Sequence, residues 1–142
     1  KYTILNNLTG SPLIRKTSFL VKESLDIKNM QKAARLLEGS HDFARFSGAL
    51  SDRNASTVRH IYDAAIDKTG EIVSFEVTGN AFLPHQVRRM AGSLVQMGRG
   101  KLVIDKFRLM VEGENTGTMI QSLPPQGLCL LRVRYASDHV QD

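Results

Sequence analysis

Hydrophobic and polar residues alternate along the first third of the chain with two different periods, which predict two short strands and a helix. Residues 1–5 have the pattern of a strand, residues 6–11 form a polar loop, and residues 17–21 fit a second short strand. A helix follows. Asp26 is a favourable N-cap residue for it, its apolar residues fall on one face, and Gly39 lies where a helix usually stops.

The rest of the chain predicts a loop, a hairpin, two more helices and a last strand. In order, these are a loop with some helical turn at 41–56, strands at 58–66 and 73–77 joined by a turn at 68–70, helices at 82–98 and 105–111, and a strand at 128–135. This order predicts an α+β fold, in which helices pack on one face of a mostly antiparallel sheet.

Composition narrows the functional classes only slightly. Of the 142 residues, 42% are apolar and 23% charged, as in an ordinary globular domain, and no apolar run approaches the length of a membrane span. The single cysteine, Cys129, excludes an internal disulfide, so we expect a cytoplasmic protein. The net charge of +5 weakly favours a polyanionic partner such as nucleic acid.

Metal and phosphate sites have little support in the sequence. The four histidines are scattered without the spacing of metal ligands, so no metal site is expected. The segment Gly98-Arg99-Gly100-Lys101 follows a predicted helix instead of opening one, which suits a helix end better than a phosphate cradle. Its two cations remain candidates for contact with an RNA backbone.

The predicted helix at 82–98 carries two adjacent arginines that face different surroundings. At 100° per residue, its apolar stripe contains Leu83, Val87, Met90, Ala91 and Leu94. Arg89 points away from this stripe, whereas Arg88 lies at its boundary, beside Gly92. Arg88 can therefore reach inward to a buried carboxylate, or cover apolar surface with its stem while its head stays in water. Both are usual behaviours of arginine.

Three blocks of sequence resemble TruA-type tRNA pseudouridine synthases. They are the stretch from Gly79 to Leu94 (GNAFLPHQVRRMAGSL) with Met97-Gly98-Arg99-Gly100 after it, the segment Leu36–Phe46 around Gly-Ser-His-Asp-Phe, and Pro124–Leu130. The blocks occur in the order of the family, and the resemblance extends from Tyr2 to Tyr135. Pro84 stands where the family frequently has histidine.

The resemblance assigns roles to individual residues. Arg88 matches the arginine that pairs with the catalytic aspartate and orients it, and Leu128 matches an apolar wall of the uridine pocket. Tyr2 is a tentative site residue, since it matches the neighbour of the tyrosine that stacks on the target base. The candidates for RNA binding are His85, Arg89, Arg99 and Lys101.

The resemblance also implies an enzyme and its partners. It implies isomerisation of uridine to pseudouridine in the anticodon stem-loop of tRNA, by a homodimer without metal or organic cofactor, with the target base flipped out. Residues 1–142 would be the C-terminal half of the catalytic domain, with a ferredoxin-like shape. The nucleophilic aspartate of the family lies in an upstream Arg-Thr-Asp-Ala-Gly segment that is missing here, so the chain alone is predicted to be inactive.

Two alternatives from other classes remain. A non-catalytic RNA-binding module of ferredoxin-like fold usually exposes aromatic residues on its central strands, whereas Phe75 shares a strand face with Val73 and Val77, which is typical of a core. A purely structural dimerisation domain is the other alternative. The basic charge and the boundary position of Arg88 count against it.

Overall fold

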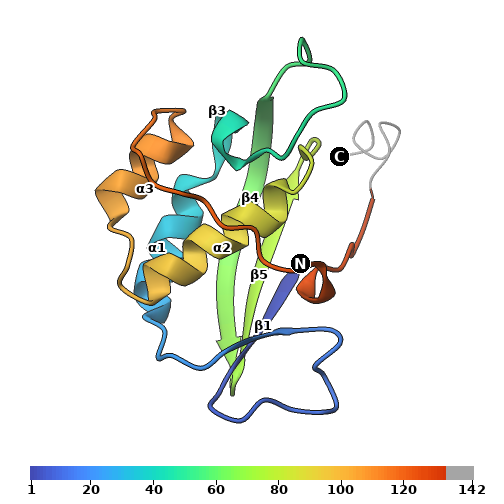
Figure 1. Cartoon of the computed structure of the whole chain (residues 1–142), viewed down its shortest axis with the longest axis vertical. Helices are drawn as coiled ribbons and strands as arrows, with labels where there is room; N and C mark the ends of the chain where they lie inside the picture. Colours follow the sequence, from blue (N-terminus) through green and yellow to red (C-terminus); the bar gives the residue numbers. More distant parts are fainter. Residues whose placement is uncertain (134–142) are drawn as a thin grey trace.

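A computed structural model of the protein describes residues 1–133. Five strands form one sheet in the order β2-β1-β5-β4-β3, and they are β1 (Tyr2–Asn6), β2 (Phe19–Val21), β3 (Gly39–Asp42), β4 (Val58–Thr69) and β5 (Ile72–Gly79). β1 and β2 are parallel, and the other neighbouring pairs are antiparallel. Figure 1 shows the long β4–β5 hairpin beside the helices. The predicted α+β class with a mostly antiparallel sheet is confirmed.

Three helices pack against one another and against the sheet. They are α1 (Ile27–Leu36), α2 (Gln86–Gly98) and α3 (Ile104–Val111). α1 lies along β4 and next to α2 (Figure 1). On β5, Val73 and Phe75 are buried in the core shared with the helices, whereas Glu76 on the opposite face is exposed. The alternation of period two therefore turns the apolar side of the sheet toward the helices.

The start of α1 agrees with the prediction, but the start of α2 does not. Asp26 caps α1 by accepting a hydrogen bond from the backbone N–H of Asn29 at 3.1 Å. The predicted helix at 82–98 begins only at Gln86, because His85 before it has the left-handed φ of 59° and interrupts the helical backbone. Residues 82–85 instead form the turn that leads from the sheet into α2.

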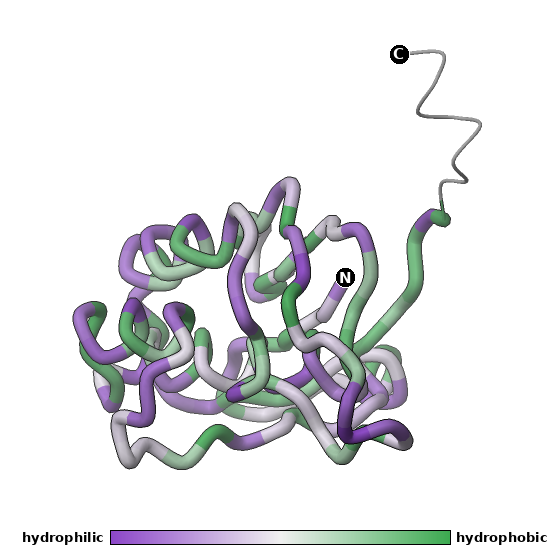
Figure 2. Tube along the Cα trace, turned by 90° about the horizontal axis from the view of Figure 1, so that it is seen from above, coloured by the Kyte–Doolittle hydropathy of each residue, from purple (hydrophilic) through white to green (hydrophobic). Residues whose placement is uncertain are grey.

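Two strand assignments at the edges of the sheet were wrong. β3 was missed because Gly-Ser-His-Asp has no apolar alternation, and it forms through pairing with the start of β4. The predicted last strand is absent over residues 128–133, where a single bridge joins Leu128 to Tyr2, and residues 134 and 135 lie outside the described part. Figure 2 shows the apolar segment before the grey trace leading away from the body. Its residues Leu130 and Val133 are exposed.

Candidate active-site residues around the first turn of α2

The chain leaves β5 through a hydrogen-bonded turn at Asn80. The side-chain oxygen of Asn80 accepts from the backbone N–H groups of His60 at 3.0 Å and of Ala81 at 2.9 Å. The backbone N–H of Asn80 donates to the carbonyl of His60 at 3.0 Å. These bonds end the β4–β5 pairing at a fixed place and direct the chain toward α2.

A buried glutamine fixes the second half of this turn. Gln86 is 1% exposed, and its side-chain oxygen accepts from the backbone N–H of Leu83 at 2.8 Å. The carbonyl of Pro84 accepts from the backbone N–H of Gly48 at 2.7 Å, which joins the turn to the loop after η1 (Ala44–Phe46). A buried polar group is retained only when it has such partners, so the first turn of α2 is held firmly.

Arg88 projects from this first turn and is held at several points. Its Nε donates to the carbonyl of Leu123 at 2.7 Å, and its Nη1 donates to Nδ1 of His85 at 2.8 Å. Its own carbonyl accepts from the backbone N–H of Leu123 at 3.1 Å. The ion pairs of the described residues do not include Arg88, although its side chain is only half-exposed. The guanidinium is therefore fixed in place while its charge lacks a carboxylate within residues 1–133.

Tyr2 supports the segment that carries Leu128. Tyr2 is fully buried, its hydroxyl donates to the carbonyl of Pro124 at 2.6 Å, and its backbone bridges to Leu128. Burial raises the pKa of Tyr2 to about 12, although the nearby positive charge of Arg88 acts in the opposite direction. At Gly127 a Cβ would stand 2.7 Å from the Tyr2 ring, so the chain passes directly over it. The ring of Tyr2 thus has no open face on which a base could stack, whereas Leu128 is 41% exposed.

The four candidate RNA-binding residues differ in the exposure of their side chains and in the contacts these make within the chain. His85 and Lys101 are exposed. Arg99 is engaged within the chain, since its Nη2 donates to the carboxylate of Glu23 at 3.0 Å and its Nη1 donates to Gln96 at 3.1 Å. The pKa of the Glu23 carboxyl is lowered by a hydrogen bond from its own backbone and by the bond from Arg99.

The expectation that Arg89 is plainly exposed was wrong. Arg89 is half-buried, and its Nε is buried without a partner in the described residues. The prediction took account only of burial on the apolar side of α2. The segment 118–123 crosses the helix on its other side (Figure 1). At the crossing, a Cβ on Gly92 would collide with the carbonyl oxygen of Gln121. Arg89 lies one turn before this crossing.

The predicted residues fall into two groups at opposite ends of α2. His85, Arg88, Tyr2 and Leu128 are connected through the segment 123–128. Arg99 follows Arg88 by eleven residues, about 16 Å along the helix axis. Sequence reasoning missed Asn80 and Gln86, although both stand in the motif, and it had no signal for the carbonyl of Leu123.

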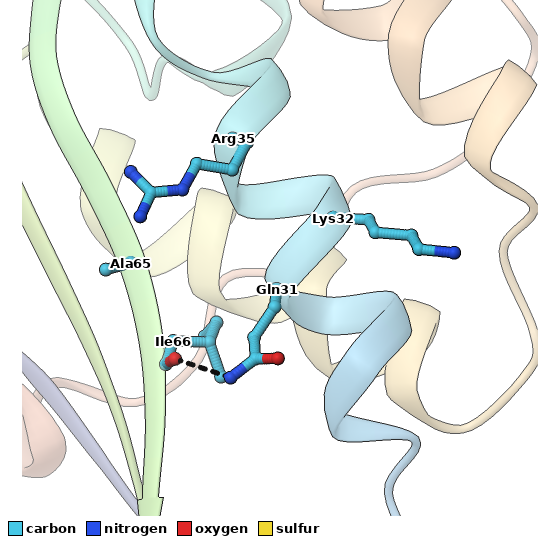
Figure 3. Close-up of a pocket in the computed structure, with 5 residues that line it drawn as sticks. All are labelled: Gln31, Lys32, Arg35, Ala65 and Ile66. Carbon is cyan, nitrogen blue, oxygen red and sulfur yellow. Dashed lines mark hydrogen bonds between the residues drawn. The ribbon is translucent and has the colours of Figure 1, made fainter.

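A cavity in the described part of the chain lies elsewhere, between α1 and β4. Its volume is about 330 Å³, and it is lined by Gln31, Lys32, Arg35, Ala65 and Ile66. Figure 3 shows Gln31 donating to the carbonyl of Ile66, at 3.2 Å, while Lys32 points away from β4. Arg35 is paired with Glu38 and Asp63. Gln31 and Arg35 are thus bound by their neighbours, and no lining residue belongs to α2.

Residues 1–133 contain neither a metal-binding cluster nor a membrane-spanning helix. Within them, no three His, Cys, Asp or Glu side chains gather closely enough to hold a metal ion. No helix in this part has the length and apolar character needed to cross a membrane.

Comparison with known proteins agrees with the motifs. A family model described as tRNA pseudouridine synthase matches residues 33–136. The protein named tRNA pseudouridine synthase A from Geotalea uraniireducens is 41% identical over 136 residues, which cover 95% of this chain and 55% of that protein. Those from Citrifermentans bemidjiense and Geobacter sulfurreducens are each 38% identical, over 95% of this chain and 54% and 55% of their own lengths. The chain spans about half the length of these relatives, and it belongs to the tRNA pseudouridine synthase family.

Proposed function

We propose that this chain supplies the arginine-bearing half of a tRNA pseudouridine synthase that isomerises uridine to pseudouridine in the anticodon stem-loop. The observation that supports the proposal is how the Arg88 side chain is buried and bound. Its guanidinium is half-buried and fixed by Leu123 and His85, yet it has no carboxylate partner among residues 1–133. The partner it suits is the aspartate that the family carries in its Arg-Thr-Asp-Ala-Gly segment.

In this reaction Arg88 acts on the aspartate and not on the base. A guanidinium beside a carboxylate keeps it ionised and in a fixed direction, and a nucleophile needs both properties. Arg88 uses Nε for Leu123 and Nη1 for His85, so Nη2 keeps its donors for the carboxylate. The reaction detaches the base from its ribose and re-attaches it through carbon, which requires that the base first leave the stack.

Leu128 and the fold are consistent with this site. Leu128 is partly exposed beside Tyr2, and it supplies an apolar wall for the flipped uracil. The order β1, α1, β4, β5, α2 and then the segment after Leu128 is that of a ferredoxin-like unit, with β1 central between β5 and Leu128. We propose that this unit is the C-terminal half of the catalytic domain. We also propose a homodimer that acts in the cytoplasm without metal or organic cofactor.

The alternative of a non-catalytic RNA-binding module is less well supported. Such a module stacks bases on exposed aromatic residues of its central strands. Phe75 on the central strand β5 is fully buried and pairs with Tyr2, which is also buried. Within the described residues, the two strands β1 and β5 therefore offer no aromatic platform of this kind.

The test compares variants of the intact protein under single-turnover conditions with unmodified tRNA. Arg88→Ala should lower the rate of pseudouridine formation roughly a hundredfold, or about 2.8 kcal/mol at about 1.4 kcal/mol per decade, while tRNA binding largely survives. Arg88→Lys should also be slow, because an ammonium cannot reproduce the planar fork. Arg108→Ala is a matched control, since Arg108 is exposed on α3 and pairs only with Asp105 among the described carboxylates. A normal rate for Arg88→Ala at saturating enzyme would refute the role of Arg88.

A further inference from the structure

The contact between His85 and Arg88 joins a donor to a ring nitrogen. Nη1 of Arg88 lies 2.8 Å from Nδ1 of His85. Arginine has only donors, so Nδ1 is the acceptor in this hydrogen bond, as in the tautomer that carries its proton on Nε2. His85 is thus a specific acceptor for one nitrogen of the guanidinium.

The backbone at His85 is held in an unusual conformation that directs this ring. His85 has φ 59°, and it is the non-glycine residue with positive φ in the described part of the chain. This left-handed region is unfavourable for residues with a Cβ, and such residues cluster where the surrounding structure over-determines them. Here Gly48 donates to the carbonyl of Pro84 at 2.7 Å, so the turn is fixed from the neighbouring loop.

Gly48 also leaves the space that the histidine ring occupies. A Cβ on Gly48 would stand 2.6 Å from Cδ2 of His85 and 3.4 Å from the carbonyl oxygen of Pro84. The ring therefore lies against the backbone of a loop that is distant in sequence, with its Nδ1 directed at Arg88. An exposed side chain used only for contact with RNA would not need this fit.

We propose that His85 is a positioning residue for Arg88, and this inference rests on the proposed function of the site. Leu123 fixes the guanidinium at Nε and His85 fixes it at Nη1, and two contacts at different nitrogens set the orientation of a planar group. Nη2 is thereby left in a fixed orientation with its donors available to the carboxylate. Without His85 the guanidinium is held at one nitrogen only, so its Nε contact opens more often and the aspartate loses its fixed partner.

Two substitutions separate the acceptor from the backbone conformation. His85→Asn keeps a side-chain acceptor at a similar distance from the backbone, and asparagine tolerates a left-handed φ. His85→Gly suits the same φ without strain but has no acceptor. Gly48→Ala is a third variant, which keeps the histidine but displaces its ring. Thermal unfolding of all three variants checks that they fold.

The first measurement is the single-turnover rate of pseudouridine formation by the intact protein at saturating tRNA, together with the tRNA affinity. Loss of one hydrogen bond to a charged group predicts that His85→Gly is roughly tenfold slower, with His85→Asn within about threefold of the parent. The rate of Gly48→Ala should be lowered about as much as that of His85→Gly. The tRNA affinity should be almost unchanged in all three variants.

The second measurement does not depend on activity. The Nε–H of Arg88 is observed by nitrogen-15 NMR, assigned by its loss in Arg88→Lys, and its exchange with water is compared among the variants. Exchange should be slow in the parent and in His85→Asn and should accelerate in His85→Gly. A parent protein that forms no pseudouridine would refute the proposed function, while the exchange comparison still decides the role of His85.

Three results would overturn the inference. One is an unchanged rate and unchanged Nε–H exchange in His85→Gly. Another is a loss in His85→Asn as large as that in His85→Gly, since the acceptor would then not matter. The third is weaker tRNA binding with a normal rate at saturation, which would make His85 an RNA contact.

Discussion

Gly92→Ala tests whether the crossing of segment 118–123 over α2 holds the site together. A methyl group at Gly92 would collide with the carbonyl oxygen of Gln121, which is backbone and cannot rotate away. The segment must therefore move off the helix. Leu123, two residues further on, is bonded to Arg88 in both directions, and the shift would strain both bonds.

The size of the effect follows from three contributions. Replacing glycine by alanine inside a helix gains up to about 1 kcal/mol. Overpacking against a rigid neighbour costs about 1–3 kcal/mol, and weakening two hydrogen bonds, one from a charged donor, costs about 1–3 kcal/mol more. The net loss in the free energy of unfolding is therefore about 1–5 kcal/mol, centred on about 3 kcal/mol.

The assay is urea unfolding followed by circular dichroism, since the chain has no tryptophan. A loss of this size should lower the urea midpoint by about 1 M or more with an unchanged slope. Gly98→Ala is the control in the same helix, because its Cβ would meet the side-chain ends of Met30 and Leu25, which can move. If Gly92→Ala were no less stable than Gly98→Ala, the structural role given to the crossing would be wrong.

Three further predictions follow from the same contacts. Because the pKa of Tyr2 is raised to about 12, its contribution to stability is complete below pH 10 and is lost as the pH rises toward 12. In alkaline urea titrations, Tyr2→Phe should remove up to about 2–3 kcal/mol of this decline in the free energy of unfolding. Tyr62→Phe, at an exposed position, is the control and should leave the decline in place. The affinity of the intact protein for tRNA should fall steeply with salt, and a flat salt dependence would contradict phosphate contact. Lys101→Ala should reduce the slope of the log binding constant against log salt concentration by about one unit. Arg99→Ala should change this slope less, because Arg99 is paired with Glu23. Residues 1–142 alone should form no pseudouridine at stoichiometric amounts, because the Arg-Thr-Asp segment is missing from them, and clear turnover would disprove this.

The sequence predicted those elements whose residues are determined locally. The cap at Asp26, the alternation in β5 and the turn at Gly70 depend on neighbours a few positions away, and each occurs as expected. In β4 a bulge between Ile61 and Asp63 interrupts the predicted alternation, so that Ile61 is buried and Tyr62 is exposed. β3 was missed because its residues are polar, and it exists through its partner strand. The predicted strand at 128–135 has the residue pattern of a strand, but over residues 128–133 it does not form one, because it lacks a partner strand there. Cys129 pairs with Lys1 in both directions, and residues 130–133 have no neighbouring strand in the described part of the chain.

The same distinction applies to the candidate site. The helical period placed Arg88 at the edge of the core, and the structure gives it a half-buried position. The period could not reveal that its Nε is bound by the carbonyl of Leu123, which lies 35 residues away in sequence. Nor could it reveal that Arg99 is held by Glu23, 76 residues away. Side-chain type and spacing indicate what a residue is able to do, and the fold decides whether the residue is free to do it.

The residues of the Gly79–Leu94 motif around α2 share one structural task, which is to position the guanidinium of Arg88. Asn80 ends the hairpin at a fixed residue, and Gln86 secures the turn from inside the core. Gly92 allows the segment 118–123 to approach closely enough for Leu123 to bind Arg88. His85 then holds the second nitrogen. Gln86 and Gly92 are buried, and the side-chain oxygen of Asn80 is bound to backbone N–H groups, so all three fit the proposed role of Arg88. A site that works by orienting a nucleophile needs accurate positioning, whereas a surface that only binds RNA does not.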